Sequence, residues 1–129
     1  MAEVVIFSAM ISGDLPSMKN QRRLFTNRKT GKPISVKSEK ALNYEAHFLG
    51  SIKGKNKTTY KGPVSLKARV WYSSKRNDLD IEFLKDLIQK AGIIENDRQI
   101  VHQEAWKGKD PEFPRVVFSL YAAEEKNSI

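Results

Sequence analysis

An alternating segment at residues 64–72 most constrains how this chain can fold. Apolar side chains occupy every second position from Val64 to Tyr72, and mostly polar side chains stand between them. Side chains of a β-strand alternate between its two faces, so this pattern predicts a strand with one buried face. Such a face has to pack against another element. Residues 64–72 therefore predict a sheet that is covered on at least one side.

Two segments predict the helices that supply this cover. Residues 79–91 carry large apolar side chains at helical spacing, and Gly92 follows where a left-handed C-cap is favoured. The same three-and-four spacing predicts an amphipathic helix over residues 38–52. Three further strands are predicted, at residues 4–11, 98–106 and 115–121. We expect the last two to pair as a hairpin.

The resulting order, β-α-β-α-β-β, indicates an α+β fold in which a mixed sheet packs against two helices. No internal repeat or change of composition divides the chain, so we expect one domain over residues 1–129. Residues 16–33 separate the first strand from the first helix. Basic and small polar residues dominate this segment, which we interpret as a basic loop.

The charge of the chain indicates a polyanionic partner. Lys and Arg number 23 against 15 Asp and Glu, which leaves a formal net charge of +8. A field of this sign attracts nucleic acid. The residues expected to contact DNA are basic or amide side chains of the loop and one arginine beside an acidic pair, namely Lys19, Asn20, Arg22, Arg23, Arg28, Lys29 and Arg76. A solvated basic surface without a ligand is the alternative interpretation.

Other partners and compartments are less compatible with the sequence. No apolar run approaches the roughly 20 residues that span a bilayer, so no membrane partner is expected. The chain has no cysteine, which excludes disulfides and cysteine-ligated zinc. The absence of a secretory signal and of cysteine leads us to expect a cytoplasmic protein. A bound metal would have to be held mainly by oxygen ligands.

Two acids lie in the connection between the predicted strand at residues 64–72 and the next predicted helix. Asp78 and Asp80 lie one residue apart, near the expected helix N-terminus, where free amide groups favour negative charge. Aspartate is a preferred capping residue, so helix capping alone can explain either of them. The second interpretation is a metal site, and it depends on a third acid.

Asp97 is the candidate third acid, and it precedes the next predicted strand. A helix over residues 80–91 rises about 17 Å. Residues 92–97 recover roughly that distance if they turn back in extended form, which would bring Asp97 to the first pair. Three converging carboxylates would suit a hard cation such as Mg²⁺. Asp97 alone is also compatible with a simple turn residue.

The segment from Arg76 to Ile100 resembles the RusA family of Holliday junction resolvases. It opens with Arg76-Asn77-Asp78-Leu79-Asp80. It closes with Ala91-Gly92-Ile93-Ile94-Glu95-Asn96-Asp97-Arg98-Gln99-Ile100. Upstream, the family's basic segment is resembled by Pro16-Ser17-Met18-Lys19-Asn20-Gln21-Arg22. The resemblance extends over most of the chain, and its central motif is the more specific of the two.

This resemblance implies a RusA-like fold and a homodimer that resolves four-way DNA junctions by paired nicks in recombination and repair. It implies Mg²⁺ as the cofactor, with Mn²⁺ as a substitute. Asp78, Asp80 and Asp97 match the family's metal-binding and catalytic aspartates. The family's catalytic lysine stands four residues after the second aspartate, where this chain has Leu84. Lys85 is either its replacement or an ordinary solvated lysine.

Two other functions remain open on the sequence. Ile81 stands where the family has an asparagine, and the displaced lysine is a second departure. Both departures are compatible with a DNA-binding module that does not cut. A basic protein–protein adaptor is the third possibility, and its affinity would be insensitive to salt, unlike phosphate recognition.

Overall fold

The main strands and helices follow the predicted order, and a short hairpin is added to them. A computed structural model describes residues 4–17, 22–26, 33–37, 39–55, 58–75 and 79–124, with the backbone alone for 22–26 and 33–37. The elements in chain order are β1 (Val5–Ser12), β2 (Arg22–Thr26), β3 (Pro33–Lys37), α1 (Glu39–Ile52), β4 (Val64–Tyr72), α2 (Glu82–Lys90), the 3-10 turn η1 (Asp97–Gln99), β5 (Ile100–Lys109) and β6 (Arg115–Ala122).

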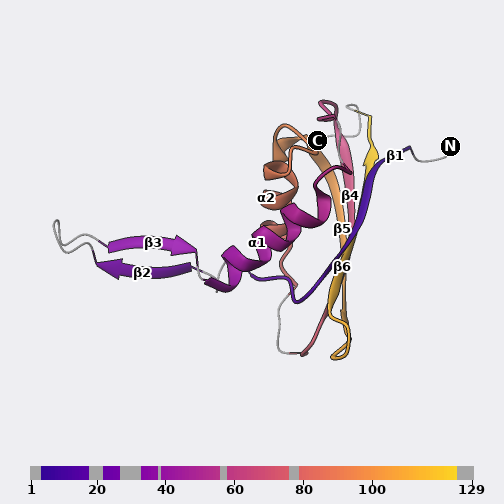
Figure 1. Cartoon of the computed structure of the whole chain (residues 1–129). Helices are drawn as coiled ribbons and strands as arrows, with labels where there is room; N and C mark the ends of the chain where they lie inside the picture. The colour runs from indigo at the N-terminus through magenta and orange to yellow at the C-terminus, as the bar shows by residue number, and fades with distance from the viewer. Residues whose placement is uncertain are drawn as a thin grey trace.

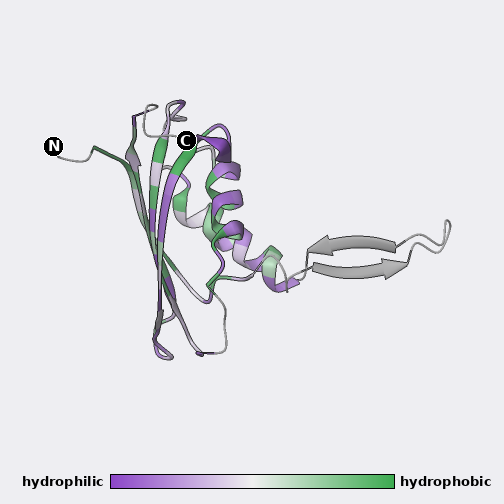
Figure 2. Ribbon diagram, turned by 180° about the vertical axis from the view of Figure 1, so that it is seen from behind, coloured by the Kyte–Doolittle hydropathy of each residue, from purple (hydrophilic) through white to green (hydrophobic). Residues whose placement is uncertain are grey.

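Four of the strands form a mixed sheet in the order β1-β6-β4-β5 (Figure 1). β4 pairs in parallel with β5, while β6 pairs antiparallel with both β4 and β1. Parallel neighbours need a long crossover, and α2 provides it between β4 and β5. Both helices lie on the same side of the sheet (Figures 1 and 2). The predicted α+β fold with a mixed sheet and two helices is confirmed.

The predicted hairpin of the last two strands is wrong. β6 lies between β1 and β4, and β5 is an edge strand on the far side of β4. The inward side chains of β6, Val116, Phe118 and Leu120, are fully buried, whereas every residue of β5 keeps some exposure. Burial of these three side chains favours β6 in the interior of the sheet. Closeness along the chain, on which the hairpin prediction rested, did not decide the pairing.

The core lies between the helix layer and one face of the sheet. The alternation that predicted β4 is confirmed, because its inward residues are all at most 1% exposed: Val64, Leu66, Ala68, Val70 and Tyr72. The helices contribute their apolar stripes, and hydrophilic residues predominate on their outer side (Figure 2). Phe48 of α1 stacks on Phe118 of β6, with ring centroids 5.8 Å apart. This packing holds the helices against the sheet.

Residues 22–26 and 33–37 form a two-stranded antiparallel sheet, and its first strand lies within residues 16–33, where the sequence analysis predicted a loop. Arg22 pairs with Lys37 and Thr26 with Pro33. The hairpin lies beyond the start of α1, apart from the main sheet (Figure 1). Both segments contain β-branched or aromatic residues, which favour strands. The basic residues around them concealed this signal.

The helices end close to the predicted residues. α1 covers 39–52, against a prediction of 38–52, and α2 covers 82–90, against 79–91. Gly92 has a φ of 78°, the left-handed conformation expected of a residue that terminates a helix. Among the helices in the described ranges, none is long and apolar enough to cross a bilayer.

Candidate active site

Asp14 ties together the loops that follow β1 and β4. Its Oδ1 accepts a hydrogen bond from the Ser73 backbone N–H at 2.7 Å, and its Oδ2 accepts one from the Ser73 hydroxyl at 2.6 Å. Gly13 precedes it with a φ of 103°, a conformation that glycine adopts without strain and that turns the chain at the end of β1. Hydrogen bonds to a carboxylate are stronger than neutral ones. Asp14 therefore holds the two loops at one end of the sheet.

Asp80 lies in the same region, between β4 and α2. Its Oδ1 accepts a hydrogen bond from the Glu82 N–H at 3.0 Å, and its Oδ2 accepts one from the Ser17 hydroxyl at 3.1 Å. The first bond satisfies a free amide at the start of α2. The N-cap residue itself is Ile81, which has no side-chain cap bond, so Asp80 accepts from the helix start without being its N-cap. A carboxylate has about four acceptor positions, so these two bonds leave room for a further ligand.

A buried tyrosine lies close to these loops. Tyr44 of α1 is 7% exposed, and its hydroxyl has no hydrogen-bond partner among the described residues. Burial raises the pKa of Tyr44 far above its ordinary value, and the nearby Tyr72 and Asp14 raise it further. A buried hydroxyl without a partner costs about 1–3 kcal/mol. The Tyr44 hydroxyl therefore does not stabilise the hydrophobic core.

Asp97 lies at the opposite end of α2 from Asp80. Its backbone N–H donates to Oε1 of Gln89, in the last turn of α2, at 3.0 Å. Asp80 bonds to the first residue of the same helix, and the nine residues of α2 rise about 14 Å. Within one chain, the structure does not bring Asp97 and Asp80 together.

The segment before β5 explains this separation. Residues 92–97 do not run back along α2, as the sequence analysis expected, but lead into Ile100, which pairs with Val64 at the start of β4. Asn96 caps the η1 turn, and its own N–H donates to Oε1 of Gln99 at 2.9 Å. The Gln99 amide nitrogen in turn donates to the carbonyls of Tyr60 and Gly62, both at 2.8 Å. These bonds anchor Asp97 near the beginning of the parallel strand pair.

Lys85 is held between α2 and β5. Its ammonium lies 2.8 Å from Oε1 of Glu82 and donates to Oε1 of Gln103 at 3.1 Å. The side chain is 16% exposed, so it is not an ordinary solvated lysine. Its two polar partners, Glu82 and Gln103, hold the ammonium at the surface between α2 and β5.

Most of the predicted DNA-binding residues, and one predicted metal ligand, lie outside the described residues. These are Lys19, Asn20, Arg28, Lys29, Arg76 and Asp78. Arg22 and Arg23 belong to β2, where their backbones pair with Lys37 and Val36. Their part in DNA binding stays a prediction.

Oxygen donors suited to Mg²⁺ are present at the ends of β1 and β4. Asp14 and Asp80 both bond to residues of the opposite loop, and Asp78 is two residues from Asp80 in the sequence. Carboxylates of this kind are the ligands that Mg²⁺ prefers. Within the described part of the chain, no group of three or more acidic or histidine side chains is arranged to hold a metal. Asp14 and Asp80 are thus donors of the kind that Mg²⁺ prefers, and Asp78 lies outside the described residues.

Asp14 is the residue of this region that the sequence analysis missed as a site candidate. Gly13-Asp14 signalled a turn after β1, and nothing local in the sequence related it to Ser73, which is 59 residues away. The available signal was an acid placed directly after a strand. The contact of Asp14 with Ser73 follows only from the tertiary structure, because β1 and β4 end at the same edge of the sheet.

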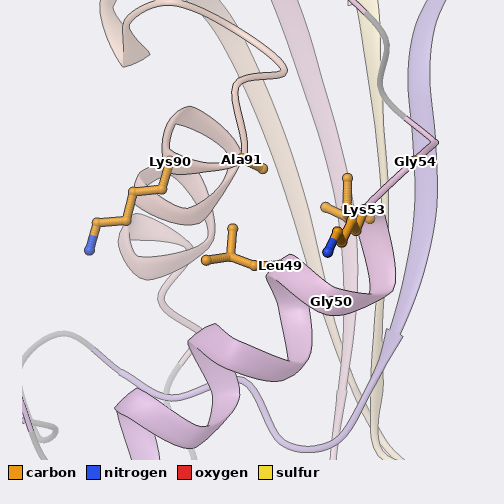
Figure 3. A pocket seen from close by; sticks show the side chains of 7 residues that line it. Leu49, Gly50, Lys53, Gly54, Lys90 and Ala91 are labelled. Atoms are coloured by element: carbon orange, nitrogen blue, oxygen red, sulfur yellow. The ribbon is translucent and has the colours of Figure 1, made fainter.

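A hollow of about 360 Å³ lies elsewhere, between the C-terminal ends of α1 and α2 (Figure 3). It is lined by Leu49, Gly50, Ile52, Lys53, Gly54, Lys90 and Ala91. The ammonium of Lys90 is 2.7 Å from a carboxylate oxygen of Glu45, and its side chain extends away from Lys53 (Figure 3). No carboxylate lines this hollow, so the acidic loops are the stronger candidate for catalysis.

Comparison with known proteins does not extend this picture. No protein-family model matches the chain, and a search of curated proteins found no match. The resemblance of residues 76–100 to the RusA family therefore stays a prediction.

Proposed function

We propose that this protein is a metal-dependent, structure-selective endodeoxyribonuclease that cuts four-way DNA junctions. One observation carries the proposal: Ser17, which bonds to Asp80, is only two residues before Lys19, where the basic segment of the sequence begins. Two residues of chain span at most about 7 Å. The first cation of the predicted DNA-binding segment is therefore within reach of a fixed carboxylate at the start of α2.

In this proposal each group has a distinct task. Asp80 and Asp78 hold the cation, while Asp14 and Ser17 keep the two loops, and hence the Asp80 carboxylate, in position. Bound Mg²⁺ would polarise the scissile phosphate and lower the pKa of an attacking water. Arg76 and the basic residues between 19 and 29 bind phosphates on either side of the cut. The protein acts as a homodimer, which supplies one cut for each of two strands.

A cleavage assay tests the proposal. Wild-type protein incubated with a mobile four-way junction and Mg²⁺ should produce paired nicks, and Asp80→Asn should abolish cleavage while junction binding persists. Asp86→Asn is the matched control, because Asp86 is an acid of the helix that Asp80 precedes, and it pairs with Lys90 at 3.4 Å. The proposal fails if the wild type binds junctions but cuts none with Mg²⁺ or Mn²⁺, or if Asp80→Asn cuts as well as Asp86→Asn.

Asp97→Asn decides the role of the third aspartate. If cleavage falls as far as in Asp80→Asn, a second copy of the chain must bring its Asp97 to the site, because one chain keeps the two residues at opposite ends of α2. If cleavage is retained, Asp97 has only its structural place in the η1 turn.

A DNA-binding module without nuclease activity is the second candidate. Two observations favour it: Lys85 already contacts Glu82 and Gln103, and Asp97 lies away from Asp80. This candidate predicts that Mg²⁺ and Mn²⁺ leave the melting temperature unchanged. The nuclease predicts a rise with metal that Asp80→Asn removes, since a ligand that binds only the folded state stabilises it.

A further inference from the structure

The face of the sheet that the helices leave bare carries cations and aromatic rings. All four strands are open on this side (Figures 1 and 2). The backbone register places the outward residues in rows across the strands. One row contains Trp71 beside Arg115 and Gly108, and the next contains Arg69 beside Trp106 and Val117.

The cations of this face lie over its aromatic rings. The Arg115 guanidinium carbon is 4.0 Å from the centre of the Trp71 ring, and that of Arg69 is 5.3 Å from the Trp106 ring. The Lys67 ammonium is 5.0 Å from the centre of the Tyr121 ring. Contacts of this kind hold the charged groups flat against the sheet. The face therefore combines aromatic rings with positive charge.

Trp106 stands between two hollows on this face. One has a volume of about 170 Å³ and is bounded by Trp71, and the other has about 440 Å³ and is bounded by Tyr121. Trp106 is 45% exposed, and Arg69 lines both hollows. Each hollow thus offers an aromatic ring on two sides and a cation at its edge.

Gly108 shapes the smaller hollow. A Cβ atom at this position would lie 2.7 Å from Cδ1 and 2.9 Å from Nε1 of Trp71. No real Cβ approaches so closely, so the absence of a side chain at Gly108 is what lets the indole lie across β5. The flat orientation of Trp71 depends on the residue next to it in the sheet.

The charge of the face indicates which kind of partner can bind there. Lys67, Arg69 and Arg115 project from it. Arg115 pairs with Asp110 at 2.9 Å, and Glu104 lies 2.9 Å from His102. A second copy docked face to face would bring two sets of these cations into one interface, where burial of like charges is unfavourable. A polyanion with flat rings complements both the charge and the aromatic surface.

We propose that the bare face of the sheet binds single-stranded nucleic acid, with bases stacked on Trp106 and its neighbouring rings and phosphates bound by Lys67 and Arg69. Stacking of bases on aromatic side chains combined with a basic surface is a recurrent mode of sequence-tolerant recognition. This surface is distinct from the acidic loops, so it adds a second nucleic-acid contact to the molecule. It does not depend on the proposed nuclease activity.

Intrinsic fluorescence tests this inference directly, because the chain's two tryptophans are Trp71 and Trp106 and both lie on this face. Wild-type protein is titrated with oligothymidylate of about 15 nucleotides, a length in the range of known single-strand sites. We expect quenching, with an affinity that falls as salt rises at a slope of about −1.4 if Lys67 and Arg69 each bind one phosphate. Trp106→Ala should weaken binding about tenfold, as loss of one stacked base predicts.

A matched pair of charge variants distinguishes binding at this face from general attraction of DNA by the net positive charge of the protein. Lys67→Gln with Arg69→Gln removes two cations from the face and should reduce the salt slope by about 1.4. Lys40→Gln with Lys53→Gln removes two exposed lysines from the helix side and should leave the affinity within about twofold after correction for net charge. Circular dichroism of every variant confirms that it is folded.

Four results would overturn the proposal. They are an absence of quenching, a Trp106→Ala variant that binds like the wild type, equal losses in the two charge variants, and a wild-type dimer that Trp106→Ala converts to monomer in sedimentation. The last result would show that a second copy covers the face. Asp80→Asn should keep the quenching, so failure of the nuclease proposal and failure of this one are distinguishable.

Discussion

Replacement of Asp80 by Ala and by Asn should separate its structural role from its proposed catalytic one. In Asp80→Ala, the Glu82 N–H and the Ser17 hydroxyl each lose the acceptor that this carboxylate provides. Loss of the acceptor for a free amide at a helix start costs about 1 kcal/mol. Loss of a partly exposed hydrogen bond to a charged group costs about another 1 kcal/mol. We therefore expect the free energy of unfolding to fall by about 2 kcal/mol.

The expected loss of unfolding free energy can be measured as a decrease in the melting temperature, Tm. For 129 residues, an unfolding entropy of about 2.1 cal/mol/K per residue amounts to about 0.27 kcal/mol/K, so the loss lowers Tm by about 7 °C. Asp80→Asn keeps a carbonyl oxygen for the Glu82 N–H and should lose only about 3 °C. Far-ultraviolet circular dichroism during heating measures both shifts.

Asp86→Ala provides the baseline for this comparison. Asp86 is within α2, which Asp80 precedes, and it pairs with Lys90 four residues later, an interaction worth about 0.3–0.5 kcal/mol. If Asp80→Ala melts within about 2 °C of Asp86→Ala, the two hydrogen bonds of Asp80 do not stabilise the fold and the expectation is refuted. A stable Asp80→Asn that no longer cuts junctions would assign the remaining acceptor positions of this carboxylate to catalysis.

Three further substitutions test other parts of the structure. Gly92→Ala places a Cβ on a residue with a φ of 78° and should cost about 1–2 kcal/mol, measured as a shift of the urea midpoint. Tyr44→Phe removes a buried hydroxyl that has no partner among the described residues, so stability at neutral pH should rise by about 1 kcal/mol. Because the pKa of Tyr44 is raised in the folded state, the wild type should also lose stability above about pH 10, where the unfolded tyrosine ionises, and Tyr44→Phe should lose less. A Tyr44→Phe variant that is less stable at neutral pH would indicate a hydroxyl partner. The hydrogen bond from Arg115 lowers the pKa of Asp110, so its stabilisation is present above about pH 4 and is lost as pH falls through the lower folded value. Asp110→Asn should remove this contribution to the acid limb of a stability–pH curve, and unchanged acid limbs would contradict the Arg115 interaction.

The strands and helices that the sequence predicted best were those with strong local periodicity. The inward residues of β4 and the apolar stripe of α2 recur at the spacing of their own secondary structure, so a short window of sequence contains the whole signal. The hairpin β2–β3 was missed because its few β-branched and aromatic residues stand among basic residues in the strands and between them. The end of α2 at Gly92 was predictable because only the chemistry of one residue decides it.

Tertiary structure decided which strands pair and whether Asp97 lies near Asp80. Local sequence favoured a hairpin of β5 and β6, yet burial of Val116, Phe118 and Leu120 places β6 between β1 and β4. The reach of residues 92–97 was sufficient to bring Asp97 toward Asp80. The hydrogen bonds of Gln99 to Tyr60 and Gly62 hold it at the other end of α2 instead.

The sequence by itself determined the basic charge of this protein, its α+β class and the position of an acid at the start of α2. Each of these depends on residue type or on spacing within one element. Only the tertiary structure decided that Asp14 meets the loop after β4, that Asp80 is held by Ser17, and that a face of rings and cations stays uncovered. These features join residues far apart in the chain, because the buried face of the sheet selects which strands are neighbours.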